Sequence, residues 1–179
     1  MVGYRILTLR DIYDLPVEIL PMTVLADNAR SLYGLLIRRH TGGFYNHAMM
    51  MHIPGSCVSQ GACLDEIGIE RYFGRHRLKF WHNPHWTDAQ RMAARAMLRY
   101  ELTKPRIKRV YDVLGIFGQW INQPWIQLPW NYYCSEHVAK ILGAVDEHFF
   151  MTTPSPSDLN RYFKASDEWE VYGISDPGL

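Results

Sequence analysis

One cysteine and the residues that follow it have the spacing of a nucleophile on a helix. Cys134 directly precedes a helical pattern whose buried face would be Val138, Ile141 and Leu142, and Gly143 suits the left-handed residue that ends a helix. The first N–H groups of a helix lack intrahelical partners and carry partial positive charge, so we expect them to favour the thiolate of Cys134. A free cysteine can also be a small buried apolar residue, which is the alternative interpretation.

A nucleophilic cysteine needs a base, and the candidate is His47 at the start of a predicted strand. Imidazole has an unperturbed pKa of about 6.5, so it can take the thiol proton near neutrality and leave a thiolate–imidazolium pair. His52 falls on the opposite face of a regular strand, so we do not expect it to serve the same site. A packed, hydrogen-bonded strand histidine is the alternative interpretation of His47.

The next predicted strand offers a group that could orient the imidazole. Gln60 and Ser59 would point to opposite faces of that strand. We favour Gln60, because its amide oxygen could accept the imidazole N–H and fix the tautomer without adding charge. Ser59 is the second candidate for the same position.

The periodicity of the chain predicts the elements that would hold these groups. We expect extended segments at Tyr4–Leu9, Phe44–Ile53, Ser56–Ala62 and Arg77–Trp81. The second and third would form a hairpin, because Pro54-Gly55 suits the turn between them. Helices are predicted from Asp27 to Gly42, from Thr87 to Tyr100, from Val110 to Ile121, from Cys134 to Gly143, and in a short segment after Pro156.

The helix after Thr87 has the clearest pattern, because Thr87 and Gln90 match a capping box. Apolar side chains at helical spacing predict a buried face formed by Met92, Ala93, Ala96, Met97 and Tyr100. Arginines at a spacing of four predict a separate, solvated face formed by Arg91, Arg95 and Arg99.

Length and composition predict one domain, residues 1–179, with a single buried core. With 47% hydrophobic and 21% charged residues and a net charge of +1, nothing in the charge points to a nucleic-acid partner. No apolar run reaches the roughly 20 residues of a transmembrane segment. Three cysteines cannot all pair and no signal-peptide core follows Met1, so we expect synthesis in the reducing cytoplasm.

Other cysteines and histidines raise the question of a metal. Cys57 and Cys63, with His76, His82 and His85, lack the tight paired spacing of a structural zinc site. We therefore expect no metal ligands and no cofactor.

The residues taken in order resemble the circularly permuted papain-like cysteine enzymes of the NlpC type, the YiiX-like group in particular. The resemblance covers about residues 33–163 and leaves 1–32 as an N-terminal extension or edge elements. Its matching segments are Leu36-Ile37, Thr41-Gly42-Gly43, Asn46-His47-Ala48, Tyr111-Asp112 with Gly115, Tyr133-Cys134-Ser135-Glu136, and Thr153-Pro154 through Asp158-Leu159.

The resemblance implies an α+β fold, in which a small antiparallel sheet packs against helices and the nucleophile lies at a helix N-terminus. Family members cleave amide bonds in cell-wall peptides, or act on lipid esters and amides as acyltransferases or thioesterases. At the matching positions Cys134 would be the nucleophile, His47 the base and Gln60 the third polar residue. Relatives often have Glu or His at that third position, and an apolar residue where this chain has His137.

Side chains close to Cys134 are candidates for contact with substrate: Tyr111, Trp130, Tyr133 and His137. Aromatic rings can stack on a sugar or hold an acyl chain, although large aromatics also dominate protein cores. His137 lies three residues after Cys134, so on a helix it could reach the site or face solvent.

Together these patterns predict a cysteine hydrolase, and the resemblance implies cleavage of an amide bond in cell-wall peptide, as by a peptidoglycan endopeptidase or amidase. Without a signal peptide such an enzyme would need delivery, for example as part of a phage particle. The alternatives are a lipid acyltransferase or thioesterase of the same fold, and a non-catalytic structural module of a virion or another assembly.

Overall fold

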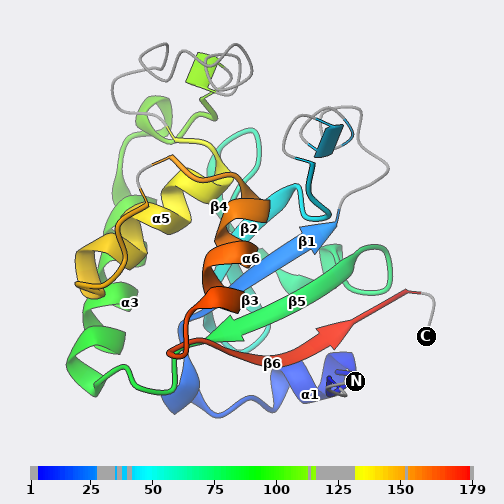
Figure 1. The fold of residues 1–179 in the computed structure, drawn as a ribbon. Helices are drawn as coiled ribbons and strands as arrows, with labels where there is room; N and C mark the ends of the chain where they lie inside the picture. The colour runs from blue at the N-terminus through cyan, green and yellow to red at the C-terminus, as the bar shows by residue number, and fades with distance from the viewer. Residues whose placement is uncertain are drawn as a thin grey trace.

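The computed structural model describes residues 4–27, 35, 38–39, 42–112, 114–115, 132–151 and 153–177. The described residues form one six-stranded antiparallel sheet, in the order β4-β3-β2-β1-β5-β6, with helices packed on it (Figure 1). The strands are β1 (Met22–Asp27), β2 (His47–Ile53), β3 (Ser56–Gln60), β4 (Leu64–Gly68), β5 (Arg77–His82) and β6 (Glu170–Ser175). The α-helices are α1 (Leu9–Tyr13), α3 (Asp88–Thr103), α5 (Cys134–Val145) and α6 (Pro156–Ala165), and the 3₁₀ turns are η1 (Val17–Ile19), η2 (Ile69–Arg71) and η3 (Arg106–Lys108).

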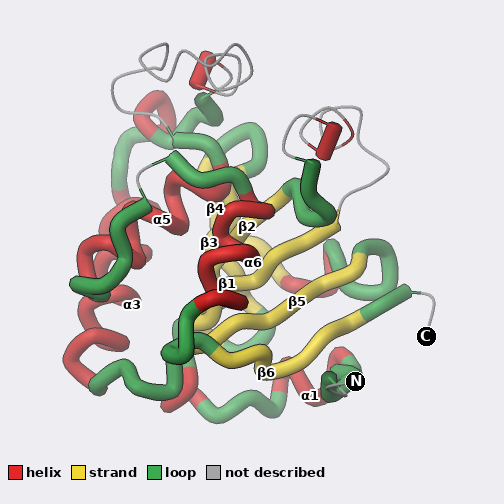
Figure 2. The backbone as a smooth tube through the Cα atoms, viewed as in Figure 1, coloured by secondary structure: helices red, strands yellow, loops and turns green. Residues whose placement is uncertain are grey.

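Two apolar layers cover opposite faces of the sheet. Along β2, Ala48 and Met50 belong to the layer packed against α3, α5 and α6, whereas Met49 and Met51 belong to the layer that includes α1. This alternation follows from the period of two along a strand. Figure 2 shows the strands side by side with α6 crossing in front of them. The expected α+β fold, an antiparallel sheet with helices, is confirmed at this level.

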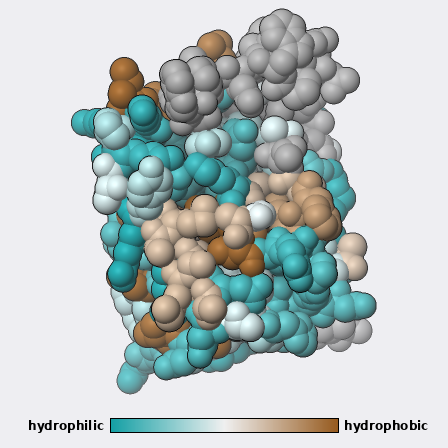
Figure 3. Space-filling model, turned by 90° about the vertical axis from the view of Figure 1, so that its left-hand side faces the viewer, coloured by the Kyte–Doolittle hydropathy of each residue, from teal (hydrophilic) through white to brown (hydrophobic). Residues whose placement is uncertain are grey.

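The helix α3 buries a different face from the one its sequence predicts. The capping box of Thr87 and Gln90 is present. Met92 and Tyr100, however, are 66% and 64% exposed, and the side chains buried along the helix are Arg91, Ala94, Leu98 and Glu101. Figure 3 shows apolar side chains gathered on the outer face of the molecule where α3 lies.

Polar contacts explain this reversal. Arg91 donates to the carbonyls of Asn83 and Pro84, and Arg95 donates to the carbonyls of Val17 and Leu20. The predicted arginine stripe is therefore partly buried, because it holds neighbouring loops in place. Glu101 accepts from Lys104 and Lys140 and joins α3 to α5.

Several predicted boundaries differ from the structure. Residues 4–9 do not form a strand: Ile6 makes an isolated bridge with Ile174, and the capping box of Thr8 and Asp11 starts α1 instead. Gly143 does not end its helix, since α5 continues to Val145.

The two remaining predicted helices also differ at their first residues. Asp27 ends β1 rather than capping a helix, and Val110 bridges Cys63 in extended conformation. Most of the residues from 28 to 41 and from 116 to 121, where those helices were expected, lie outside the described part of the chain.

Within the described residues, no helix combines the length and the apolar character that crossing a membrane requires.

Candidate functional site

Cys134 is the first residue of α5, and the start of this helix lies against the beginning of β2. Tyr133 precedes it in extended conformation and provides no side-chain cap, so the N–H groups of the first turn are available to other acceptors. Val138 packs in the same apolar layer as Ala48 of β2. The pairing of β2 with β3 ends at Met49 and Ser59 on this side.

Burial raises the pKa of the Cys134 thiol, and four hydrogen-bond donors act against it: the backbone N–H groups of Ala48, Ser135 and Cys134 itself, and the Tyr111 hydroxyl. Each lowers the pKa of the thiol, as the helix-start argument predicts. Burial acts in the opposite direction and outweighs them, so the pKa is raised overall. The thiol is therefore protonated at rest, contrary to the expectation of a favoured thiolate.

The imidazole of His47 is held between two side chains. Its Nε2 shares a hydrogen bond of 2.8 Å with Ser59 Oγ, and its ring stacks on Tyr72 with centroids 5.5 Å apart and planes 9° from parallel. Burial lowers the pKa of His47 to about 4, and nearby His76 acts in the same direction. The imidazole of His47 is thus neutral at rest, so the structure has a thiol and a neutral imidazole rather than the expected ion pair.

Ser59 contacts His47, whereas Gln60, the residue predicted to do so, does not. Ser59 lies opposite Met49, and opposed residues of an antiparallel pair share a face. His47 and Met49 are two residues apart on β2 and share that face too, whereas Gln60 points to the other one. The prediction that Gln60 orients the imidazole is therefore wrong, because the register of β2 and β3 places Ser59 beside His47 instead.

Gln60 has a different structural role. Its Nε2 donates to the Arg109 carbonyl at 2.8 Å. The same segment is held by two backbone hydrogen bonds, from Leu64 to Arg109 at 2.7 Å and from Tyr111 to Ala62 at 3.0 Å. Gln60 thus helps to fix the segment that brings the Tyr111 hydroxyl to the Cys134 sulfur.

Of the residues predicted to contact substrate, Tyr111 is the one that the structure brings to Cys134. Tyr133 is buried at the N-cap of α5. His137 is 1% exposed, and its Nε2 has no hydrogen-bond partner among the described residues. Burial lowers its pKa to about 4, so it is part of the core rather than a substrate contact. Trp130 lies outside the described residues.

Two buried carboxyl groups, on Glu136 and Asp112, belong to the segments that carry Cys134 and Tyr111, and the sequence argument did not use them. Burial raises the pKa of Glu136 to about 7, against the Tyr133 N–H that donates to it, and Asp112 raises it further. Asp112 is fully buried, and its Oδ1 accepts the Gly115 N–H at 2.7 Å. A Cβ at Gly115 would lie 2.6 Å from Asp112 Oδ2, which accounts for glycine there. Both carboxyl groups lie in segments already singled out in the sequence, Tyr111-Asp112 and Cys134-Ser135-Glu136, so these segments could have pointed to them.

Tyr72 is a further residue that sequence reasoning missed. Its ring lies on His47, and the Ser59 hydroxyl hydrogen-bonds to its oxygen. Tyr72 follows the 3₁₀ turn η2 and lies on no predicted element, so the sequence carries no signal that would join it to His47.

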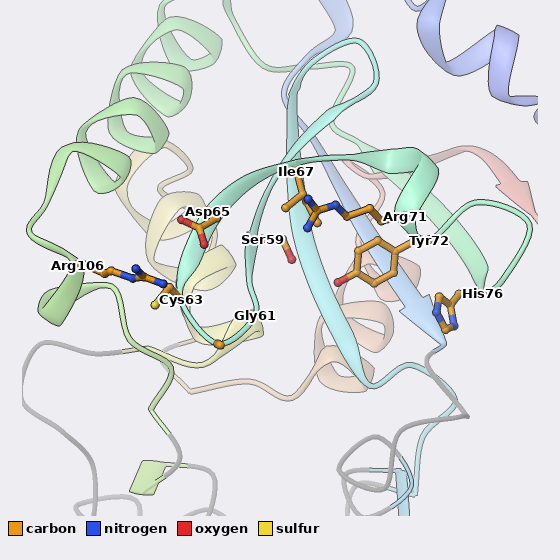
Figure 4. A pocket seen from close by; sticks show the side chains of 10 residues that line it. Ser59, Gly61, Cys63, Asp65, Ile67, Arg71, Tyr72, His76 and Arg106 are labelled. Carbon is orange, nitrogen blue, oxygen red and sulfur yellow. The ribbon is translucent and has the colours of Figure 1, made fainter.

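A pocket of about 390 Å³ has Ser59 and Tyr72, the two residues that contact His47, in its wall, whereas His47 and Cys134 do not line it (Figure 4). Arg71 of η2 and Arg106 of η3 also line it. Its acidic residue, Asp65, is paired with Arg109 at 3.2 Å. The pocket therefore has an excess of positive charge next to the group that holds the base.

The described residues contain no group of three or more His, Cys, Asp or Glu side chains placed to hold a metal ion. Cys57, Cys63 and Cys134 are all free thiols.

No protein-family model, curated protein or solved structure matches this chain. What the site can do must therefore be inferred from its own geometry.

Proposed function

We propose that the protein is a cysteine hydrolase with a permuted papain-like fold of the NlpC type, and that it cleaves an amide bond through a thioester on Cys134. The observation that carries the proposal is the arrangement of donors at the start of α5. The sulfur accepts hydrogen bonds from Tyr111 and from the N–H of Ala48, whose neighbour His47 is fixed by Ser59. A nucleophile, a base and an orienting group from a helix and two strands support this class of chemistry.

The mechanism starts from two neutral groups. The proposed route requires the His47 ring to reach the sulfur: Nδ1, which Ser59 leaves open, takes the thiol proton as the sulfur attacks the substrate carbonyl. The new C–S bond leaves an oxyanion, which the Cys134 and Ser135 N–H groups at the helix start can stabilise. The imidazolium then protonates the leaving amine as the C–N bond breaks. The neutral imidazole then takes a proton from water as the water oxygen attacks the thioester, and it passes that proton to the sulfur as the C–S bond breaks.

The basic pocket beside Ser59 supports a substrate that carries an anionic group. Arg71 and Arg106 both line it, and Asp65, which also pairs with Arg109, is the acidic residue in its wall. Guanidinium groups bind carboxylates strongly. We propose a cell-wall peptide as the substrate, because peptides offer both the scissile amide and a free carboxylate.

A non-catalytic assembly module is the second candidate, and the 2% exposure of Cys134 is the observation that favours it. A protonated, enclosed thiol is also what a packed cysteine would show.

The two candidates can be separated with soluble peptide fragments from purified cell walls. We expect the wild-type protein to release new amino groups and to form an acyl adduct on Cys134 that intact-mass analysis detects after acid quenching. Cys57→Ala is the matched control, because it removes a buried thiol on β3 outside the site. If the wild-type protein shows neither turnover nor an adduct with peptide or acyl substrates, the result would support the assembly module instead.

A further inference from the structure

Lys79 is a charged residue within an apolar layer of the sheet. On β5 it lies opposite Leu25 of β1 and Ile174 of β6, and it shares a face with Trp81 two residues later. Leu25 and Trp81 belong to the apolar layer covered by α6. Lys79 is nevertheless only 4% exposed. A buried ammonium is costly unless another group compensates for the lost water.

Lys79 contacts aromatic rings, but it has no ion-pair partner among the described residues. Its Nζ lies 4.4 Å from the centroid of the Trp81 ring and 4.9 Å from that of Tyr4. The charged group that acts on it is Lys164 of α6, which has the same sign; together with burial it lowers the pKa of Lys79 to about 8. Neither lysine forms an ion pair with any described residue.

Both lysines line a hollow of about 480 Å³ between β5, β6 and α6. The rings of Tyr4 and Phe44 form part of its wall, with Tyr45, whose pKa burial raises to about 12, so that its hydroxyl stays protonated. The wall also contains Arg77 and Asp176, which pair with each other at 2.6 Å. Three positive charges and one negative charge leave a net charge of +2 around the hollow.

We propose that this hollow is a binding site for a phosphate monoester, with the phosphate between Lys79 and Lys164 and the organic part against Tyr4 and Phe44. A phosphate dianion matches the two uncompensated charges, whereas a carboxylate would match one. Lysine binds phosphate as a point charge and donates hydrogen bonds to it. None of the residues that line this hollow lines the pocket beside Ser59, so the site is independent of the cysteine chemistry.

The test is titration of the full-length protein with inorganic phosphate and with phenyl phosphate, followed by calorimetry and by tryptophan fluorescence. Trp81 next to Lys79 provides the optical signal. We expect saturable binding, tighter for phenyl phosphate than for inorganic phosphate. Phenol and benzoate, which lack the dianion, should bind at least about tenfold more weakly.

Two variants and a control assign that binding to the hollow. Lys79→Met and Lys164→Met should each weaken phenyl phosphate binding by about tenfold or more, since each removes a charge-assisted hydrogen bond. Lys108→Met, which removes a lysine of η3 that does not line the hollow, should leave binding unchanged. Vesicles containing phosphatidic acid test a lipid source of the same group: binding that requires the vesicle would place the monoester on a lipid.

Thermal unfolding keeps the proposal testable if a variant alters folding. Lys79→Met should melt no lower than the wild type, because it removes a buried charge, and it should lose the rise in melting temperature that phenyl phosphate gives the wild type. A structural lysine held only by its aromatic neighbours would instead lower the melting temperature when replaced. The proposal is overturned if the wild type shows no saturable binding of either phosphate, or if Lys79→Met binds phenyl phosphate as tightly as the wild type.

Discussion

The surroundings of Cys57 and Cys134 differ although both thiols are buried. Cys57 lies on β3 opposite Met51, in the apolar layer that includes α1, where burial and the charge of Glu70 raise its pKa. Cys134 is desolvated too, but backbone N–H groups and the Tyr111 hydroxyl oppose that effect. Burial alone therefore does not separate a nucleophile from a packing residue. What distinguishes the proposed nucleophile, Cys134, is the set of donors that act on its sulfur.

Replacing each cysteine by alanine is the strongest way to break this comparison. Cys134→Ala should reduce amide cleavage by on the order of 10⁴-fold or more, because the covalent route is lost. Cys57→Ala should retain activity and lose about 1 kcal/mol of unfolding free energy, since it removes one buried sulfur from a packed layer. The readouts are amine release and urea unfolding. Equal activity of the two variants would contradict the assignment of Cys134.

The orienting role of Ser59 gives the next largest effect. Ser59→Ala should lower kcat by about 10- to 100-fold and Ser59→Thr should restore part of it, since the hydroxyl that holds His47 Nε2 is lost and then regained. Gln60→Ala should cost less, because Gln60 contacts the Arg109 carbonyl rather than the base. The measurement is a pH–rate profile for each variant. A larger loss for Gln60→Ala would reverse the two roles.

His137 is a second buried group on α5. Unlike Cys134, it has a ring nitrogen, Nε2, with no hydrogen-bond partner among the described residues. Its folded pKa of about 4 lies below the ordinary value of about 6.5, so the unfolded chain binds the proton first as pH falls. Above about pH 6.5 the neutral imidazole costs the folded state nothing. Between about pH 6.5 and 4 the free energy of unfolding falls as the pH falls, and the loss is about 2 kcal/mol at pH 5. His47 acts in the same direction. Urea unfolding at pH 7 and pH 5 should show a smaller loss in His137→Gln than in the wild type.

The smallest expected effect concerns one donor. Tyr111→Phe removes the hydroxyl that lowers the thiol pKa, so Cys134 should be alkylated by iodoacetamide up to about tenfold more slowly at pH 8. The wild-type rate should reach half its maximum above the pH typical of an exposed cysteine, because burial raises the pKa. Peptide mapping can follow Cys57 in the same sample as an internal control. An unchanged Cys134 rate would mean that Tyr111 does not act on the sulfur.

The predictable part of the site was the part encoded locally. Cys134 at a helix start and His47 at a strand start follow from short patterns, and both lie where expected. The choice between Ser59 and Gln60 depends on the register of two strands, which a single sequence does not specify. Tyr72 reaches His47 only through the packing of η2 on the sheet, so no pattern near His47 could reveal it.

The fold shows the same limit. Strand β1 was missed because its residues from Met22 to Ala26 are all buried, so it lacks the alternation that marks a half-exposed strand. In α3 the capping signal was correct, yet the buried face was wrong, because Arg91 and Glu101 have partners on other segments. Hydrophobic periodicity finds an element, but long-range polar contacts decide which way the element faces.

The hydrogen bond from Gln60 has a consequence for which substitutions the site can tolerate. Its acceptor is the main-chain oxygen of residue 109, which every amino acid provides, so this bond itself places no demand on the identity of the side chain there. Position 60, in contrast, needs a donor of a particular reach, and asparagine is one methylene too short. Random mutagenesis with selection for activity should therefore find position 60 restricted by this bond, whereas any restriction at position 109 comes from the contacts of the Arg109 side chain with the Leu64 carbonyl and Asp65.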